Sequence, residues 1–206
     1  MRKYIRTVET LEMDGGWLCL DFINTIRHRY ETPQHDYLEG YDQIITWFLR
    51  QQLITQEEAV SLRKYNNTPR ADEAHQAGIT VRETLYQLFL PIIHQNKPEL
   101  TVVARFNEYV QEACSSFRII IEARQQVRET WHWEPGQLQQ LWYPVIKSAH
   151  ALLLSDLLGR VKECQACGWL FLDKSKNGSR RWCNMQTCGS SAKSRRYYNK
   201  SKDAYD

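Results

Sequence analysis

Apolar residues recur every three or four positions in several stretches of the chain between residues 41 and 161. This spacing places them on one face of an α-helix, so it predicts a series of amphipathic helices. The clearest stretch covers residues 137–161, where we expect one long helix that Pro144 kinks or restarts. The shorter apolar run over residues 17–25 fits a strand or turn that leads into a helix. These patterns predict a mainly α fold.

Local signals mark where three of the helices begin. Thr55 and Glu58 form a capping box, in which each side chain hydrogen-bonds the backbone N–H of the other residue. Pro69 suits the first position of a helix that runs towards Leu90, because the missing N–H of proline has no partner there in any case. Pro98 is expected to begin another helix.

The segment between the last two helical stretches has a different composition. Residues 117–122 and 127–133 are rich in β-branched and aromatic side chains, which are typical of strands. We therefore expect one small β-hairpin within the otherwise helical first part of the chain.

Composition indicates a globular protein, with 42% hydrophobic and 25% charged residues among 206. No apolar run approaches the roughly 18–20 residues that span a bilayer. The basic N-terminus is not followed by the apolar region and cleavage site of a signal peptide. We therefore expect a cytoplasmic protein without a membrane partner, and in a reducing compartment clustered cysteines bind metal more often than they form disulfides.

Charge is distributed unevenly along the chain. Residues 160–206 contain eleven basic and four acidic side chains, a net charge of +7, whereas residues 1–159 carry a net charge of −4. A basic end on an acidic body suggests that the two parts have different roles.

Four cysteines in the basic end form two closely spaced pairs, Cys164 with Cys167 and Cys183 with Cys188. Two pairs separated by a loop of this length are typical of a structural zinc site. Four thiolates leave no open coordination position for water or substrate, so we expect structural Zn²⁺ and no enzymatic activity. The other two cysteines, Cys19 and Cys114, are most simply small core residues.

The sequence around these pairs predicts a knuckle, a hairpin and a helix. Gly168 permits a tight turn after Cys167. Residues 169–173 and 180–183 are expected to be the two strands, and Ser190 or Ser191 the N-cap of the helix that follows. We therefore predict a helical domain over residues 1–160 and a treble-clef or ribbon-like zinc finger over residues 161–206.

The cysteine region resembles the CGNR zinc-finger family. The shared residues are Cys164-x-x-Cys167-Gly168-Trp169-x-Phe171-x-Asp173-x-Ser175 and Arg180-Arg181-Trp182-Cys183-x-Met185-x-x-Cys188-Gly189. Upstream, Leu20-Asp21-Phe22-Ile23-Asn24-Thr25 resembles a segment of the helical ABATE-type domain that precedes this finger. This chain has Ser190-Ser191 where the family has Asn-Arg. The resemblance implies a bacterial stress-related transcription regulator with the finger as its DNA binder.

The basic side chains of the finger are the candidate nucleic-acid contacts. They are Lys174, Lys176, Arg180, Arg181, Lys193, Arg195, Arg196 and Lys200. Several cations on one surface attract phosphates and release counterions on binding, which favours DNA as the partner and is also compatible with RNA. The alternative is a zinc-stabilised protein-interaction module that docks on an acidic partner or on its own helical domain and binds no nucleic acid.

Asp21 and Asn24 are polar residues within the apolar run over residues 17–25. Buried polar groups need hydrogen-bond partners, which either a structural network or the ligand of a small-molecule effector pocket would supply. The helical domain is accordingly expected to sense an effector or to form a homodimer. The six histidines are scattered and form no catalytic pattern.

Overall fold

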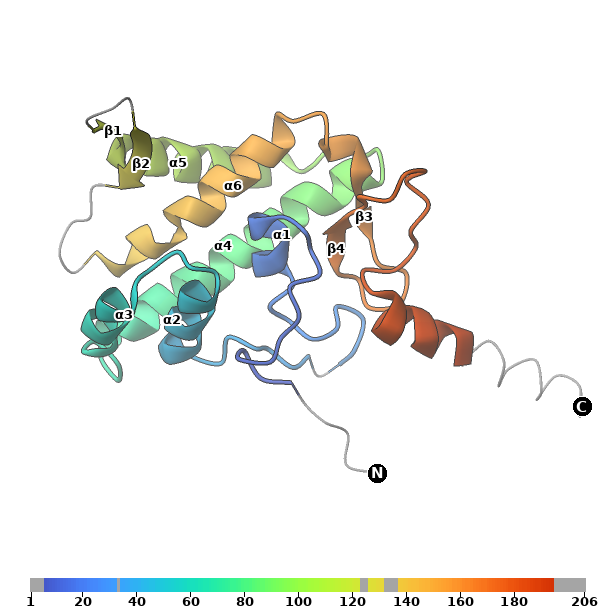
Figure 1. Ribbon diagram of the computed structural model, residues 1–206, viewed down its shortest axis with the longest axis horizontal. Coiled ribbons are helices and arrows are strands. Elements are labelled where there is room, and N and C mark those ends of the chain that lie inside the picture. The colour runs from blue at the N-terminus through green and yellow to red at the C-terminus, as the bar shows by residue number, and fades with distance from the viewer. Residues whose placement is uncertain (1–5, 33, 123–125, 132–136, 195–206) are drawn as a thin grey trace, which may run out of the picture.

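The computed structural model describes residues 6–32, 34–122, 126–131 and 137–194, and its architecture is mainly α as predicted (Figure 1). The α-helices are α1 (Leu18–Ile23), α2 (Tyr41–Arg50), α3 (Gln56–Arg63), α4 (Pro69–Ile93), α5 (Leu100–Ser116) and α6 (Tyr143–Leu153). Two antiparallel hairpins pair β1 (Phe117–Ile121) with β2 (Val127–Trp131), and β3 (Val161–Glu163) with β4 (Leu170–Leu172). Shorter turns are the 3₁₀ helices η2 (Leu138–Trp142) and η3 (Leu158–Arg160) and the π-helix η4 (Met185–Gly189).

Aromatic side chains fill the centre of the helical part. The ring of Phe22 on α1 lies 5.2 Å from that of Trp47 and 5.4 Å from that of Trp142, in the edge-on and tilted arrangements that aromatic pairs prefer. Gly78 lets α4 approach this cluster, because a Cβ atom at that position would lie 2.1 Å from the Trp142 ring. The short helix α1 thus packs against α4, α6 and β4.

The local start signals predict the helix termini well. Thr55 and Glu58 make both hydrogen bonds of the capping box, and Pro69 is the first residue of α4. The helix expected from Pro98 begins two residues later, at Leu100. The apolar run over residues 17–25 forms a helix and contains no strand.

The prediction of one long helix over residues 137–161 was wrong. Pro144 marks a restart, because η2 precedes it and α6 begins beside it. The helix then ends at Leu153, where the hydroxyl of Ser155 donates to the carbonyl of Leu152 and competes with the helical hydrogen bonds. The apolar pattern continues past this point in the sequence, but Leu154 is 76% exposed.

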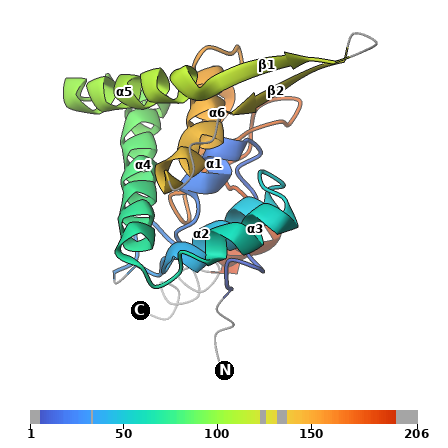
Figure 2. The same ribbon diagram turned by 90° about the vertical axis from the view of Figure 1, so that its left-hand side faces the viewer.

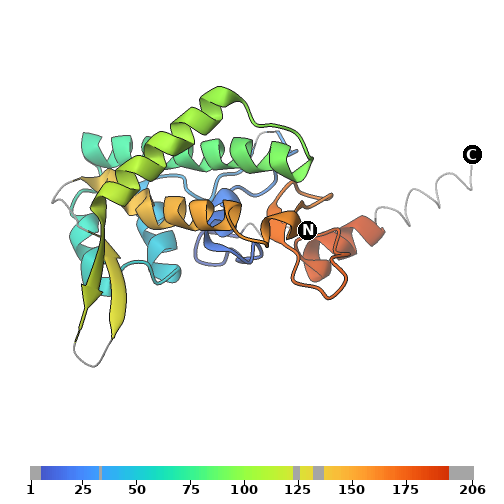
Figure 3. The ribbon, with the colours of Figure 1, turned by 90° about the horizontal axis from the view of Figure 1, so that it is seen from above.

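The hairpin of β1 and β2 confirms the prediction for residues 117–122 and 127–131, whereas residues 132 and 133 lie outside the described residues. At its base Phe117 packs on Trp131, with ring centroids 5.5 Å apart, and Trp131 lies beside Tyr143 of α6. Beyond this base the hairpin projects past the helices (Figures 2 and 3). Cys19 and Cys114 were both expected to be core residues. Cys19 is buried as expected, but Cys114 on α5 is exposed.

The predicted division between residues 160 and 161 falls at the junction of η3 and β3. The apolar core crosses this junction, because Val161, Leu170 and Leu172 are buried together with side chains of the helical part. Among the described residues, no helix is both long enough and apolar enough to cross a membrane.

Candidate metal centre

The four predicted ligands converge at the C-terminal end of the structure. The sulfur atoms of Cys164, Cys167, Cys183 and Cys188 all lie within 4.8 Å of one another. The Sγ atom of Cys183 is 3.8 Å from that of Cys167 and 3.7 Å from that of Cys188. Disulfide sulfurs are about 2.05 Å apart, whereas sulfurs at the corners of a tetrahedron with metal–sulfur bonds of about 2.3 Å are about 3.8 Å apart. The spacing therefore fits four thiolates around one metal ion.

Hydrogen bonds among the four thiols affect their protonation differently. The bond with Cys167, the largest effect, lowers the pKa of Cys164, whereas the pKa values of Cys167 and Cys183 are raised. The thiolate is the form that binds metal, so a metal ion would displace the protons that remain in the cluster.

The first two ligands lie in a knuckle that joins β3 to β4. Cys164 donates its N–H to the carbonyl of Trp169 at 2.7 Å, and Gly168 donates to the carbonyl of Cys164 at 2.9 Å. Gly168 has a φ of +76°, which glycine adopts at little cost. The knuckle predicted from the sequence is confirmed, with its two strands flanking the first cysteine pair.

The second two ligands lie at the start of the C-terminal helical segment. Asn184 follows Cys183 and caps this segment, because its Oδ1 accepts from the N–H groups of Gln186 and Thr187 at 2.8 and 3.2 Å. Cys188 lies within η4, and residues 190–194 continue as α-helix. The expected N-cap at Ser190 or Ser191 was therefore wrong, because both serines lie inside the helical segment that Asn184 begins.

A buried carboxylate organises the loop between the two pairs. Asp173 is fully buried and accepts hydrogen bonds from the Lys162 ammonium at 2.9 Å, the Ser175 hydroxyl at 2.6 Å and the Arg180 N–H at 2.9 Å. Burial alone would raise the pKa of Asp173, but these hydrogen bonds outweigh it and hold the pKa well below its usual value. The carboxylate is therefore charged and fixes the path of residues 173–180.

This loop explains why the strand predicted over residues 180–183 does not form. The carbonyl of Arg180 accepts from Lys162, and that of Arg181 accepts from the N–H of Gln165. The carbonyl of Cys183 accepts from the Arg180 guanidinium. Because these groups satisfy the backbone, β4 pairs with β3 and not with this segment.

Asn24 joins the helical part to the finger through its amide. Its Nδ2 donates to the carbonyl of Leu170 at 2.8 Å, and its Oδ1 accepts from the N–H of Leu170 at 3.0 Å. Asp21 accepts from the N–H of Gly15 at 2.8 Å. Both residues predicted to line an effector pocket are thus buried in structural hydrogen bonds.

The loop that follows α1 covers the knuckle. The indole N–H of Trp169 donates to the carbonyl of Ile26 at 2.6 Å, and the N–H of Arg29 donates to the carbonyl of Cys167 at 2.8 Å. A Cβ atom on Gly168 would lie 2.6 Å from the Cβ of Arg29, so only glycine permits this approach. The metal centre is therefore built against the helical part.

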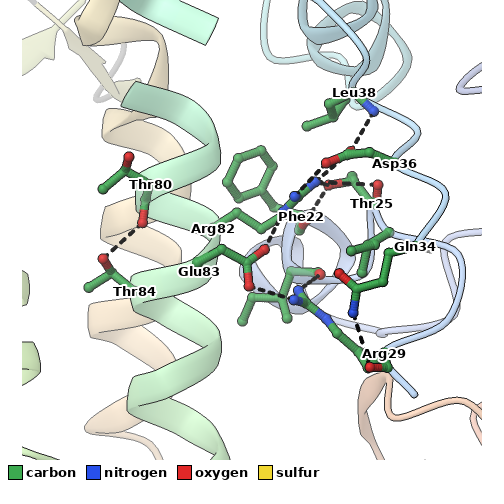
Figure 4. A network of polar contacts seen from close by, with 12 residues as sticks. Phe22, Thr25, Arg29, Gln34, Asp36, Leu38, Thr80, Arg82, Glu83 and Thr84 are labelled. Atoms are coloured by element: carbon green, nitrogen blue, oxygen red, sulfur yellow. Dashed lines mark hydrogen bonds and ion pairs between the residues drawn. The ribbon is translucent and has the colours of Figure 1, made fainter. Parts of the chain in front are cut away.

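A polar network centred on the buried Arg82 of α4 holds the loop in place (Figure 4). The guanidinium of Arg82 donates to both carboxylate oxygens of Asp36, at 2.7 and 2.6 Å. Arg29 donates to Glu83 and to the carbonyl of Ile23, each at 2.6 Å. No spacing in the sequence predicts this network, because its members are brought together only by the fold.

The pKa of Asp21 allows a test of its structural role. Burial raises this pKa to about 6, against smaller lowering effects from the N–H groups of Gly15 and Gly16. Because the pKa is raised in the folded protein, the protonated carboxyl contributes to the free energy of unfolding below about pH 4. This contribution is lost as the pH rises through about 6.

Replacement of Asp21 with asparagine is therefore expected to stabilise the protein relative to wild type by about 2–3 kcal/mol above pH 7, by about half of that near pH 5, and by little at pH 4. Urea unfolding between pH 4 and 8 measures this difference. Asp156→Asn, at an exposed carboxylate, is the matched control for the removal of one negative charge. An unchanged difference across this range would contradict the assigned burial of the Asp21 charge.

The predicted nucleic-acid contacts divide into three groups. Lys174, Lys176, Arg181 and Lys193 are exposed. Arg180 is half-buried, with its guanidinium over the Phe171 ring at 4.9 Å, and supports the fold of the finger. The remaining three, Arg195, Arg196 and Lys200, lie outside the described residues.

A groove beside the cysteines was not predicted. It has a volume of about 340 Å³ and is lined by Cys167, Cys183, Cys188 and Ser191 of the finger. Arg27 and His28 of the helical part also line it. Their position directly after the apolar run over residues 17–25 is the only sequence signal that points to them.

Comparison with known families agrees with this geometry. The family model described as "Putative stress-induced transcription regulator" (ABATE) matches residues 16–156, and the CGNR zinc finger model matches residues 160–201. No curated protein matches the chain.

Proposed function

Because the chain belongs to the ABATE family and ends in a CGNR zinc finger, we propose that it is a zinc-dependent transcription regulator that binds DNA through the finger. The observation that carries this proposal is the four-cysteine centre with exposed cations on the segments around it. Zinc is the metal that four thiolates at tetrahedral spacing most often bind as a structural ion. An iron–sulfur ligand set is also tetrahedral, so elemental analysis of the purified protein identifies the metal.

The role we propose for the metal is structural. Four thiolates complete its coordination, so no position is left for a water or a substrate to react. The ion would hold the knuckle next to the helical segment that begins at Asn184. We accordingly propose a binding function and no catalysis.

Four cations support the DNA-binding surface. Lys174 and Lys176 lie on the loop fixed by Asp173, Arg181 precedes the second cysteine pair, and Lys193 lies on the C-terminal helical segment. The ion pairs of the described finger residues use Lys162 with Asp173 and Glu163 with His94, so these four cations keep their charge available for phosphates. Each phosphate contact adds to affinity through counterion release.

Charge reversal at three of these positions tests the proposal. The triple variant Lys174→Glu/Lys176→Glu/Arg181→Glu is expected to bind duplex DNA about 100-fold more weakly than wild type, with a salt dependence reduced by about 3 in its logarithmic slope. Fluorescence anisotropy of zinc-loaded protein with a random-sequence DNA pool, at several salt concentrations, measures both quantities.

The matched control carries Lys64→Glu/Arg70→Glu/Arg105→Glu, at exposed cations of the helical part with no ion pair among the described residues. It changes the net charge equally and is expected to lose only a few-fold in affinity. An equal loss in both variants would indicate a nonspecific charge effect. Absence of wild-type binding to any DNA or RNA would instead favour the protein-interaction alternative.

A further inference from the structure

The projecting hairpin exposes an apolar face. Ile119, Ile121 and Val127 are 55%, 75% and 64% exposed. Ile121 lies opposite Val127 across the two strands, and Ile119 lies on the same face because side chains alternate along a strand. Apolar side chains gathered in this way on one surface are typical of an interaction site.

The hairpin also presents a free strand edge. Glu122 donates its N–H to the carbonyl of Gln126 at 2.8 Å, so the even-numbered residues of β1 direct their backbone groups towards β2. The backbone groups of Ile119 and Ile121 consequently face the opposite edge, where the described part of the chain supplies no strand. β2 is tied to α6 through Glu129 and Lys147, and β1 lies on the outer side of the hairpin (Figures 2 and 3). An exposed edge of this kind is a template for another strand.

The charges along β1 are complementary to those of a second, antiparallel β1. When two copies pair about a two-fold axis at Ile120, Ile119 of each copy lies opposite Ile121 of the other. In the same register Arg118 of each copy lies opposite Glu122 of the other. Opposite charges in such cross-strand pairs stabilise a sheet and like charges destabilise it. Glu122 already pairs with Arg128 at 2.6 Å in its own chain, so it would lie between two guanidinium groups.

From this edge, face and charge pattern we propose that two copies of the chain dimerise through β1, forming a continuous four-stranded antiparallel sheet centred on Ile120. The outward backbone groups of Ile119 and Ile121 supply the hydrogen bonds between the copies. Because the paired strands run in opposite directions, α5 leaves the sheet at opposite ends in the two copies. The two helical bodies, with their fingers, therefore lie on opposite sides of the axis. This inference does not depend on whether the finger binds DNA.

Charge exchange tests the register in solution. Arg118→Glu and Glu122→Arg each place like charges opposite each other twice in a homodimer. Each single variant is expected to raise the dimer dissociation constant about tenfold or more. In an equimolar mixture of the two variants, both pairs become complementary in the mixed dimer, and dimerisation should recover. Sedimentation velocity across a concentration series measures these changes, and circular dichroism checks that each variant is folded.

Site-directed crosslinking provides a second, independent measurement. In this register the two Ile120 residues face each other in a non-hydrogen-bonded pair with Cα atoms about 4.5 Å apart, within the range of a disulfide. In a zinc-loaded Cys114→Ser background, Ile120→Cys is expected to give a disulfide-linked dimer on mild oxidation. The control, Ile119→Cys, has its symmetry mate at a diagonal position about 7–8 Å away and should crosslink poorly.

A wild-type chain that stays monomeric at all concentrations would overturn the proposal. So would a dimer that neither single charge variant weakens, or one that crosslinks equally well through both cysteine positions. Either result would assign the exposed apolar face to a different partner or register.

Discussion

Replacing Cys164 with serine is expected to release the metal and unfold the finger. Structural zinc contributes on the order of 10 kcal/mol to the folding of small domains. A segment of about 45 residues has too small an apolar core to replace that contribution. Limited proteolysis should then remove the region after residue 160, while most of the helical part survives because Val161, Leu170 and Leu172 are only a small share of its core.

Far-UV circular dichroism and zinc stoichiometry complete this test. Wild type and Cys114→Ser are expected to retain one equivalent of zinc, because Cys114 is exposed on α5 and outside the cluster. Treatment of wild type with a strong chelator should reproduce the protease sensitivity of Cys164→Ser. An unchanged digestion pattern in both cases would show that the metal does not hold the finger together.

Replacing Arg82 with leucine is expected to lower the free energy of unfolding by about 1–3 kcal/mol. Arg82 is 2% exposed, and its guanidinium pairs with Asp36 and Glu83. Removal of the guanidinium leaves Asp36 and Glu83 without their ion pair, and water compensates part of the loss because these carboxylates are 31% and 36% exposed. Burial alone would lower the pKa of Arg82, but its hydrogen bonds to the Asp36 carboxylate raise this pKa. The side chain is therefore charged in the folded protein.

The effect of this substitution should extend to the metal centre. Asp36 and the Thr25 hydroxyl, 3.3 Å from Arg82, belong to the loop that covers the knuckle. Arg82→Leu is therefore expected to release zinc to a chelator faster than wild type does. Arg70→Leu on the same helix is the control, since an exposed substitution usually changes stability by less than about 0.5 kcal/mol. Urea unfolding and a zinc-release assay measure the two effects, and equal stabilities of both variants would contradict the assigned role.

Features set by neighbouring residues were predictable from the sequence. The capping box of Thr55 and Glu58 and the proline start of α4 are local hydrogen-bonding and conformational effects. The abundance of β-branched and aromatic side chains predicted the hairpin of β1 and β2. The spacing of the cysteines predicted the cluster, because a two-residue spacer brings both thiols of a knuckle to one side.

Features set by distant contacts were not predictable. The end of α6 is a separate case, because it involves a local hydrogen bond from Ser155 to Leu152 that the apolar periodicity past Leu153 does not report. The strand expected over residues 180–183 does not form, because Lys162 and Gln165 donate hydrogen bonds to carbonyl groups of this segment. Likewise, the amide of Asn24 meets a backbone 146 residues further along the chain, a contact that one sequence alone does not reveal.

The hydrogen bonds between Asn24 and Leu170 affect how the chain can be divided into fragments. A fragment cut at residue 161 would lose the acceptor of the Trp169 indole and both partners of the Leu170 backbone. It would also expose Leu170 and Leu172 to water, which promotes aggregation. The proposed DNA binding is therefore best measured on the intact polypeptide, where the helical part supplies these hydrogen-bond partners and covers Leu170 and Leu172.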